Sequence, residues 1–287
     1  MLDFRYHVTS LVAVFFALII GIVVGVGISG RGFVDKSERH KFDSRIERLQ
    51  SRVDELSAKN DVLREQQQAG SAFMADAYPV LMENRLAGKR IAIVVVGGDG
   101  GGTGSDVNQT LEDADAAPAR YRALKLPVAA RTVRRALARL PGYRLLADAG
   151  RELAQEWVTG GKTPVADALT SVVVEEQRGS GAPPVDGVIV IPAGRPPDAA
   201  TRRFLDGLYA GLGTGGVPVV VVEQSTTDTS MVPEFRQLGG FSTVDDIDTP
   251  SGRFALALLL GGAPPGDFGL KPTATAPLPK IVPPTGA

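Results

Sequence analysis

The residue types that most often carry catalysis are nearly missing from this chain. It has no cysteine, and its two histidines, His7 and His40, both precede the predicted folded domain. Histidine is the commonest general base, and thiolate chemistry requires cysteine. A Ser-His-Asp or Cys-His active site in the folded domain is therefore excluded. We expect no enzyme and no catalytic residue, with only carboxylate chemistry left open.

The soft groups that select copper are also sparse. The four methionines, Met1, Met74, Met82 and Met231, form no M-x-x-M pattern. Met74 and Met82 lie eight positions apart, roughly on one face of a helix, which is typical of packing rather than of a ligand pair. The sequence therefore shows no ligand set for a metal, and copper is compatible with it only as a transported ion.

Three carboxylates lie close together at Asp245, Asp246 and Asp248. Such a group could bind a hard cation such as Ca²⁺ or Mg²⁺. However, Asp248 or Thr249 is suited to cap a helix, and Pro250 favours the first helical position. Acidic residues there also complement the helix dipole. The pattern favours a helix start over a cation site.

A glycine-rich segment, Gly97–Gly104, follows a predicted strand. The dinucleotide fingerprint G-x-G-x-x-G fails in every register, and no G-K-[ST] follows. We therefore expect a flexible loop that opens a helix at Ser105 or Asp106, and no bound cofactor.

The elements that would position these residues alternate between strands and helices. Short β-branched runs predict buried strands at residues 89–98, 185–191 and 217–222, and two further strands are expected at 120–126 and 240–244. Helical patterns fall between them, at about 105–115, 129–139, 145–157, 197–211 and 250–260. This alternation predicts an α/β domain with a Rossmann-like, doubly wound, mostly parallel sheet.

A membrane helix is predicted before this domain, because residues 8–28 contain no charged side chain. At about 1.5 Å per residue the run reaches about 31 Å, enough to cross a bilayer. It is too long for a secretory signal and lacks an A-x-A cleavage site, so we expect a retained anchor. Small residues recur every fourth position, which favours helix self-association over chance composition: Ala13, Ala17, Gly21, Gly25 and Ser29.

A charged heptad segment follows, from Asp35 to about Gln68. The a positions are Ile46, Val53 and Asn60, and the d positions are Phe42, Leu49, Leu56 and Leu63. β-branched residues at a with Leu at d favour a parallel dimer, and one Asn at a fixes the register. No g–e′ pair of side chains has opposite charges. The alternative of a single helix that packs on its own domain or on another partner therefore remains. The heptad ends near Gln67 and Gly70, and a second helix is expected over 71–86.

These patterns predict four regions: a membrane anchor over 1–30, a coiled-coil stalk over 31–70, an α/β domain over 71–262 and an extended proline-rich tail over 263–287. The expected partners are the lipid bilayer and a second copy of the chain. The net charge of −1 gives no reason to expect nucleic acid.

The block at 241–252, FSTVDDIDTPSG, resembles the mycobacterial copper transport protein B family. Phe268-Gly269, Lys271-Pro272 and the opening LDFRYH at 2–7 support the resemblance, which covers nearly the whole chain. It implies a cell-envelope protein that keeps intracellular copper low, regarded in mycobacteria as an outer-membrane channel. Members also resemble anchored envelope factors of cell separation. The resemblance supplies no ligand residues.

The orientation in the membrane is contested. Lys and Arg are concentrated after the helix, which by the positive-inside rule would place the domain in the cytoplasm. The resemblance implies an extracytoplasmic domain, and we adopt that expectation. Two functions follow: copper efflux or homeostasis in the envelope, or a non-enzymatic scaffold that dimerises through its stalk and recruits an envelope or division protein.

Overall fold

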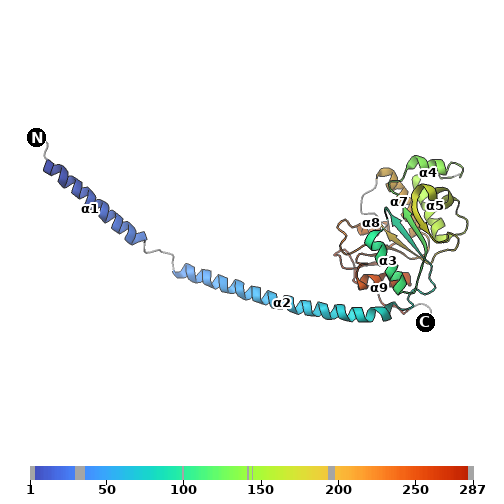
Figure 1. Cartoon of the computed structure of the whole chain (residues 1–287), viewed down its shortest axis with the longest axis horizontal. Helices are drawn as coiled ribbons and strands as arrows, with labels where there is room; N and C mark the ends of the chain where they lie inside the picture. The colour runs from blue at the N-terminus through green and yellow to red at the C-terminus, as the bar shows by residue number, and fades with distance from the viewer. Residues whose placement is uncertain are drawn as a thin grey trace. The chain divides into compact units, whose positions relative to one another are not determined.

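The computed structural model describes residues 4–29, 36–98, 100–140, 142–143, 145–192 and 198–283. The chain divides into two compact units between Gly70 and Ser71. The N-terminal unit consists of helices, and the C-terminal unit contains a sheet with helices on both faces (Figure 1).

The first helix, α1 (Phe4–Ser29), contains the predicted anchor. Within it, His7–Gly27 has a mean hydropathy of 2.7, and its apolar side chains are exposed in the single chain. Among the described residues it is the one helix long and apolar enough to cross a membrane. Length and composition therefore agree with the predicted span.

The second helix, α2 (Lys36–Met82), corrects the expected break near Gln67 and Gly70, because it runs through both without interruption. A glycine in a helix costs only about 1 kcal/mol. The end of the helix recovers stability by packing, since Met74, Tyr78 and Met82 contact a core of the C-terminal unit. The expected second helix is thus the last part of α2, and it ends before Leu86.

Five parallel strands form the centre of the sheet, as the sequence predicts. They are β1 (Ile91–Val96), β2 (Pro118–Leu124), β4 (Gly187–Ile191), β5 (Val219–Val222) and β6 (Ser242–Val244). The strand order is β3-β2-β1-β4-β5-β6-β7.

Two edge strands were not predicted. β3 (Val174–Arg178) has the sequence VEEQR, which lacks the apolar pattern of a buried strand, and it pairs antiparallel with β2. At the other edge β7 (Asp267–Phe268) pairs parallel with β6. The expected extended tail is therefore corrected, because Phe268 and Pro279 are buried and Arg85 Nη1 donates to the carbonyl of Val282.

Helices cover both faces of the sheet because successive β1 side chains alternate between two apolar cores. Ala92, Val94 and Val96 belong to one core, whereas Ile91, Ile93 and Val95 belong to the other. The first core is closed by α4 (Ala130–Ala136), α5 (Leu146–Thr159), α6 (Pro164–Val173), α7 (Ala199–Gly213) and α8 (Val232–Leu238). The second is closed by α3 (Gly101–Asp113), α9 (Pro250–Leu260) and the end of α2.

Helices α5 and α7 pack with their backbones in close contact. A Cβ at Gly207 would overlap the Ala147 carbonyl, and one at Gly150 would overlap the Phe204 carbonyl. Glycine is therefore required at both positions, which the sequence patterns did not indicate.

Candidate functional site

The carboxylates that follow β6 lie at the carboxyl end of the sheet, where open α/β sheets usually bind ligands. Asp245 is completely buried. Its Oδ1 accepts hydrogen bonds from the backbone N–H groups of Leu270 and Lys271, at 2.9 and 3.1 Å. Asp245 therefore holds the segment after β7 against the end of β6.

Asp248 and Thr249 organise the loop and the helix that follow. Asp248 accepts from both the backbone N–H and the hydroxyl of Ser225, each at 2.6 Å. Thr249 caps α9 by accepting from the N–H of Gly252 at 3.0 Å, and Pro250 is the first helical residue. The predicted helix start is confirmed. Burial raises the pKa of Asp248, but the hydrogen bonds from Ser225 outweigh it and lower the pKa.

Asp246 is also completely buried. Its Oδ2 accepts from the hydroxyls of Thr249 and Ser251, at 3.0 and 3.4 Å, whereas its Oδ1 has no partner. Burial and the negative charge of Asp245 raise the pKa of Asp246.

Nearby carboxylates are paired with cations. Lys271 Nζ lies 3.3 Å from Glu223 Oε2, and Arg253 Nη2 lies 2.8 Å from Asp106 Oδ1. Among the described residues, no group of three or more His, Cys, Asp or Glu side chains is arranged to hold a metal ion. The hydrogen bonds and ion pairs of these carboxylates stabilise the loops at this end of the sheet.

The glycine-rich segment differs from its prediction. Gly100 adopts a left-handed conformation with φ 78° and α3 begins at Gly101, earlier than the expected Ser105 or Asp106. The Gln224 amide covers the first turn, since a Cβ at Gly102 would lie 2.8 Å from Gln224 Nε2. The same amide donates to Asp106 Oδ2 at 2.8 Å.

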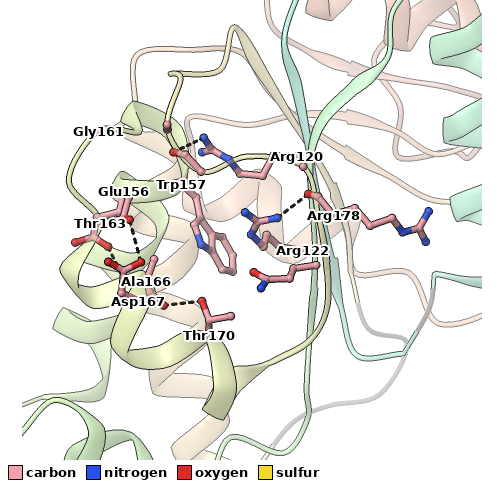
Figure 2. Close-up of a pocket in the computed structure, with 14 residues that line it drawn as sticks. Arg120, Arg122, Glu156, Trp157, Gly161, Thr163, Ala166, Asp167, Thr170 and Arg178 are labelled. Carbon is pink, nitrogen blue, oxygen red and sulfur yellow. Dashed lines mark hydrogen bonds between the residues drawn. The ribbon is translucent and has the colours of Figure 1, made fainter.

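A second group of buried charges lines a cleft of about 610 Å³ between the β2–β3 edge of the sheet and helices α5 and α6 (Figure 2). We call it the arginine cleft. Its principal side chains are Arg120 and Arg122 on β2, Glu156 and Trp157 on α5, Asp167 on α6 and Gln177 on β3.

Arg120 organises the loop that follows β3. Only 1% of the residue is exposed, and its guanidinium donates to three backbone carbonyls, those of Ser180, Gly181 and Pro183, at 2.7–3.2 Å. Its Nη1 is buried without a partner. Burial lowers the pKa of Arg120.

Arg122 lies two residues further along β2 and is 6% exposed. Its Nη1 donates to the carbonyls of Tyr121 and Arg178, at 2.7 and 2.8 Å. Burial and the positive charge of Arg120 lower the pKa of Arg122 to about 10, so it stays protonated at neutral pH. Within the described part of the chain, neither Arg120 nor Arg122 forms an ion pair with a carboxylate.

The carboxylates of the facing wall are engaged in the start of α6. Both oxygens of Glu156 accept backbone N–H groups, from Val165 at 3.0 Å and from Ala166 at 2.6 Å. Burial raises the pKa of Glu156. Asp167 Oδ1 accepts from the hydroxyl of Thr163 at 3.3 Å.

Met74 and Met82 pack as predicted, and Met1 lies outside the described residues. Met82 is completely buried, and Met74 is packed beside the same core. Met231 packs against the other core. His7 is exposed on α1, and the side chain of His40 lies outside the description.

The predicted self-association residues all lie on exposed helix surfaces of the single chain, and their pairing stays a prediction. On α1 these are Ala13, Ala17, Gly21 and Gly25. On α2 they are Ile46, Leu49, Val53, Leu56, Asn60 and Leu63.

Sequence reasoning missed Arg120 and Arg122, although both fell within a predicted strand. The available signal was a pair of arginines at alternate positions of a strand that is otherwise typical of a buried one.

Residues 1–279 match the family described as "Copper transport outer membrane protein, MctB". The chain belongs to the MctB family. The match extends from the N-terminal apolar helix through nearly all of the C-terminal unit, which confirms the resemblance drawn from the sequence.

Proteins named "Copper transporter MctB", from Mycobacterium bovis and from two strains of Mycobacterium tuberculosis, are each 31% identical to this MctB-family chain over 93 residues. The aligned part covers 32% of this chain and 28% of each relative. The chain therefore aligns with under a third of the length of these relatives.

Proposed function

We propose that this protein is a membrane-anchored component of the cell envelope that takes part in copper efflux and so keeps intracellular copper low. The observation that carries the proposal is the family match over residues 1–279. The exposed apolar surface of His7–Gly27 supports anchoring in a bilayer. The family description favours this role over a purely structural envelope scaffold.

The chain's own ligand chemistry limits how copper could be handled. There is no cysteine, and Met74, Met82 and Met231 pack against the cores. Imidazole suits Cu(II), and His7 and His40 flank the membrane helix. We therefore propose that copper is a passing cargo, met near the membrane or carried by an assembled partner.

The direct test is intracellular copper in cells that lack this protein, with and without a copper challenge. We expect accumulation that the wild-type gene reverses. A gene carrying both His7→Ala and His40→Ala would restore efflux only if a partner supplies the ligands. Unchanged copper in the deletion strain would overturn the proposal and leave the scaffold as the better account.

We also propose that the stalk pairs in parallel with a second copy. The heptad side chains support this because they are uncovered in the single chain, with Leu49, Val53 and Leu56 each 62% exposed. Asn60→Ile should then give a more stable but less specific assembly, because one buried Asn fixes register. A chain that sediments as a monomer with and without the substitution would contradict pairing.

The α/β domain is proposed to be Rossmann-like and extracytoplasmic. The order β2-β1-β4-β5-β6 of the five parallel strands supports the first point, because doubly wound dinucleotide-binding sheets have the same order at these positions. The edge strand β3 differs from that fold, since it runs antiparallel. The absence of cysteine from the chain makes the orientation testable. A membrane-impermeant maleimide should label Ser57→Cys on the stalk and spare Asp3→Cys before the helix. The reverse pattern would place the domain inside the cell.

A further inference from the structure

We propose that the arginine cleft is a binding site for a phosphate group, either free or as a phosphate monoester, held by Arg122 with Arg120 beside it. This inference is independent of the copper role. It rests on two buried guanidinium groups that share one face of β2 and line an open cleft.

The charges in the cleft are unbalanced on the strand side. Buried charges in proteins are normally paired, because removing an ion from water costs several kcal/mol. Among the described residues, the partners of Arg120 and Arg122 are backbone carbonyls, and Arg120 is close enough to Arg122 to disfavour its charge. A dianion between them would offset both the desolvation and the repulsion.

The donors left unused match an oxyanion. Within the described residues, the bonds of Arg122 use its Nη1, so its Nε and Nη2 are left for a ligand. These two groups form the edge of a guanidinium that binds phosphate with two parallel hydrogen bonds. Arg120 adds the buried Nη1 that has no partner.

The direction of the side chains supports the same assignment. Figure 2 shows the guanidinium of Arg122 projecting from β2 toward Trp157 and α6. Arg178 also lines the cleft, and its backbone carbonyl accepts from Arg122, but its side chain points away. Arg178 is instead paired with Glu176 and stacked over the ring of Tyr121. Glu156 on the facing wall accepts from two backbone N–H groups, and it forms no ion pair with Arg122 within the described part of the chain.

The chain carries its own reporter, because Trp157 lines the cleft and is the only tryptophan. The full-length protein in dodecyl maltoside micelles would be titrated with orthophosphate at constant ionic strength, with sodium chloride as the reference. A second arm would dope the micelles with phosphatidic acid, to separate a lipid phosphate from a free one. We expect a saturable change in Trp157 fluorescence, with a raised unfolding temperature, in at least one arm.

Two variants with the same change in charge make the test specific. Arg122→Gln should raise the half-saturating phosphate concentration by about tenfold or more, because it removes hydrogen bonds between charged groups. Arg178→Gln should leave it unchanged. Arg122→Lys keeps the charge but loses the paired Nε and Nη2 donors, so its half-saturating concentration should lie between those of the wild type and Arg122→Gln. It replaces Arg122→Gln in the test if that variant does not fold.

Three results would overturn the proposal. The first is no response in the wild type beyond that of chloride in both arms. The second is an equal loss in Arg122→Gln and Arg178→Gln, which would indicate bulk charge. The third is an unchanged response in a folded Arg122→Lys together with an unchanged response in Arg122→Gln.

Discussion

Two groups of buried charges in the domain differ in the partners that surround them. At the carboxyl ends of β5 and β6, Asp245 and Asp248 accept hydrogen bonds from loop backbone, and Glu223 is paired with Lys271. In the arginine cleft, Arg120 and Arg122 have only carbonyl oxygens as partners. In the first group most carboxylate oxygens hold loop backbone or a cation, although Asp245 Oδ2 and Asp246 Oδ1 have no hydrogen-bond partner among the described residues. In the second group the guanidinium groups line an open cleft and have unused donors that face it.

This difference separates a distinctive sequence block from a candidate binding site. The block FSTVDDIDTPSG is the clearest mark of the family resemblance, yet its described hydrogen bonds stabilise loops and cap α9. Arg120 and Arg122 belong to no recognised sequence motif, yet they line an open cleft. A buried charge without a counter-ion is the better pointer to a ligand.

The largest effect is expected at Asp245. Asp245→Ala would remove a completely buried carboxylate and leave the N–H groups of Leu270 and Lys271 without their acceptor, which should lower the free energy of unfolding by about 3 kcal/mol. Denaturation in detergent micelles, followed by Trp157 fluorescence, measures it. Asp206→Ala, an exposed carboxylate on α7, is the matched control and should change the free energy by less than about 0.5 kcal/mol. Equal effects of the two substitutions would contradict a structural role for Asp245.

A smaller, pH-dependent effect is expected at Asp246, whose pKa is raised by burial. A carboxyl with a raised pKa in the folded state destabilises the fold when ionised, and that cost disappears as pH falls through the raised pKa toward the ordinary value of about 3.9. Asp246→Asn removes the charge while keeping the size. Its stability relative to the wild type should therefore be greatest near neutral pH and decline in acid.

Denaturation of both proteins between pH 4 and pH 8 tests this prediction. Carboxyl groups whose pKa is lowered in the fold, such as those of Asp186 and Asp248, stabilise the fold when ionised, and this contribution to the free energy of unfolding is lost in acid. Asp186 is present in both proteins and is paired with Arg90, so its contribution cancels in the difference. Asp248 contributes to the raised pKa of Asp246, so it adds to the pH dependence that the substitution removes. A stability difference that does not vary with pH would show that the Asp246 carboxyl is not perturbed.

The smallest change in stability is expected at Arg122, in the other group of charges. Arg122→Gln removes two hydrogen bonds to carbonyls but also removes a buried charge that Arg120 repels. The opposing terms should leave the free energy of unfolding within about 1 kcal/mol of the wild type. Chemical denaturation without phosphate measures it. A loss as large as that of Asp245→Ala would make Arg122 a structural residue and remove the contrast between the two regions.

The sequence determined what depends on neighbours along the chain. Spacing and composition predicted the apolar run over 8–28, the five parallel strands, the start of α9 near Thr249 and the lack of a histidine or cysteine site in the folded domain. Each follows from local periodicity, side-chain capping or the residue inventory.

Tertiary structure decided the rest, because burial depends on what packs from elsewhere. β3 and β7 have weak strand patterns and exist because β2 and β6 offer open edges. α2 continues past Gly70 because the domain packs against Met74 and Met82. Arginines at alternate positions of a strand are ordinary at an exposed edge. Only the enclosing loop at 179–183 and helices α5 and α6 bury Arg120 and Arg122 without a counter-ion.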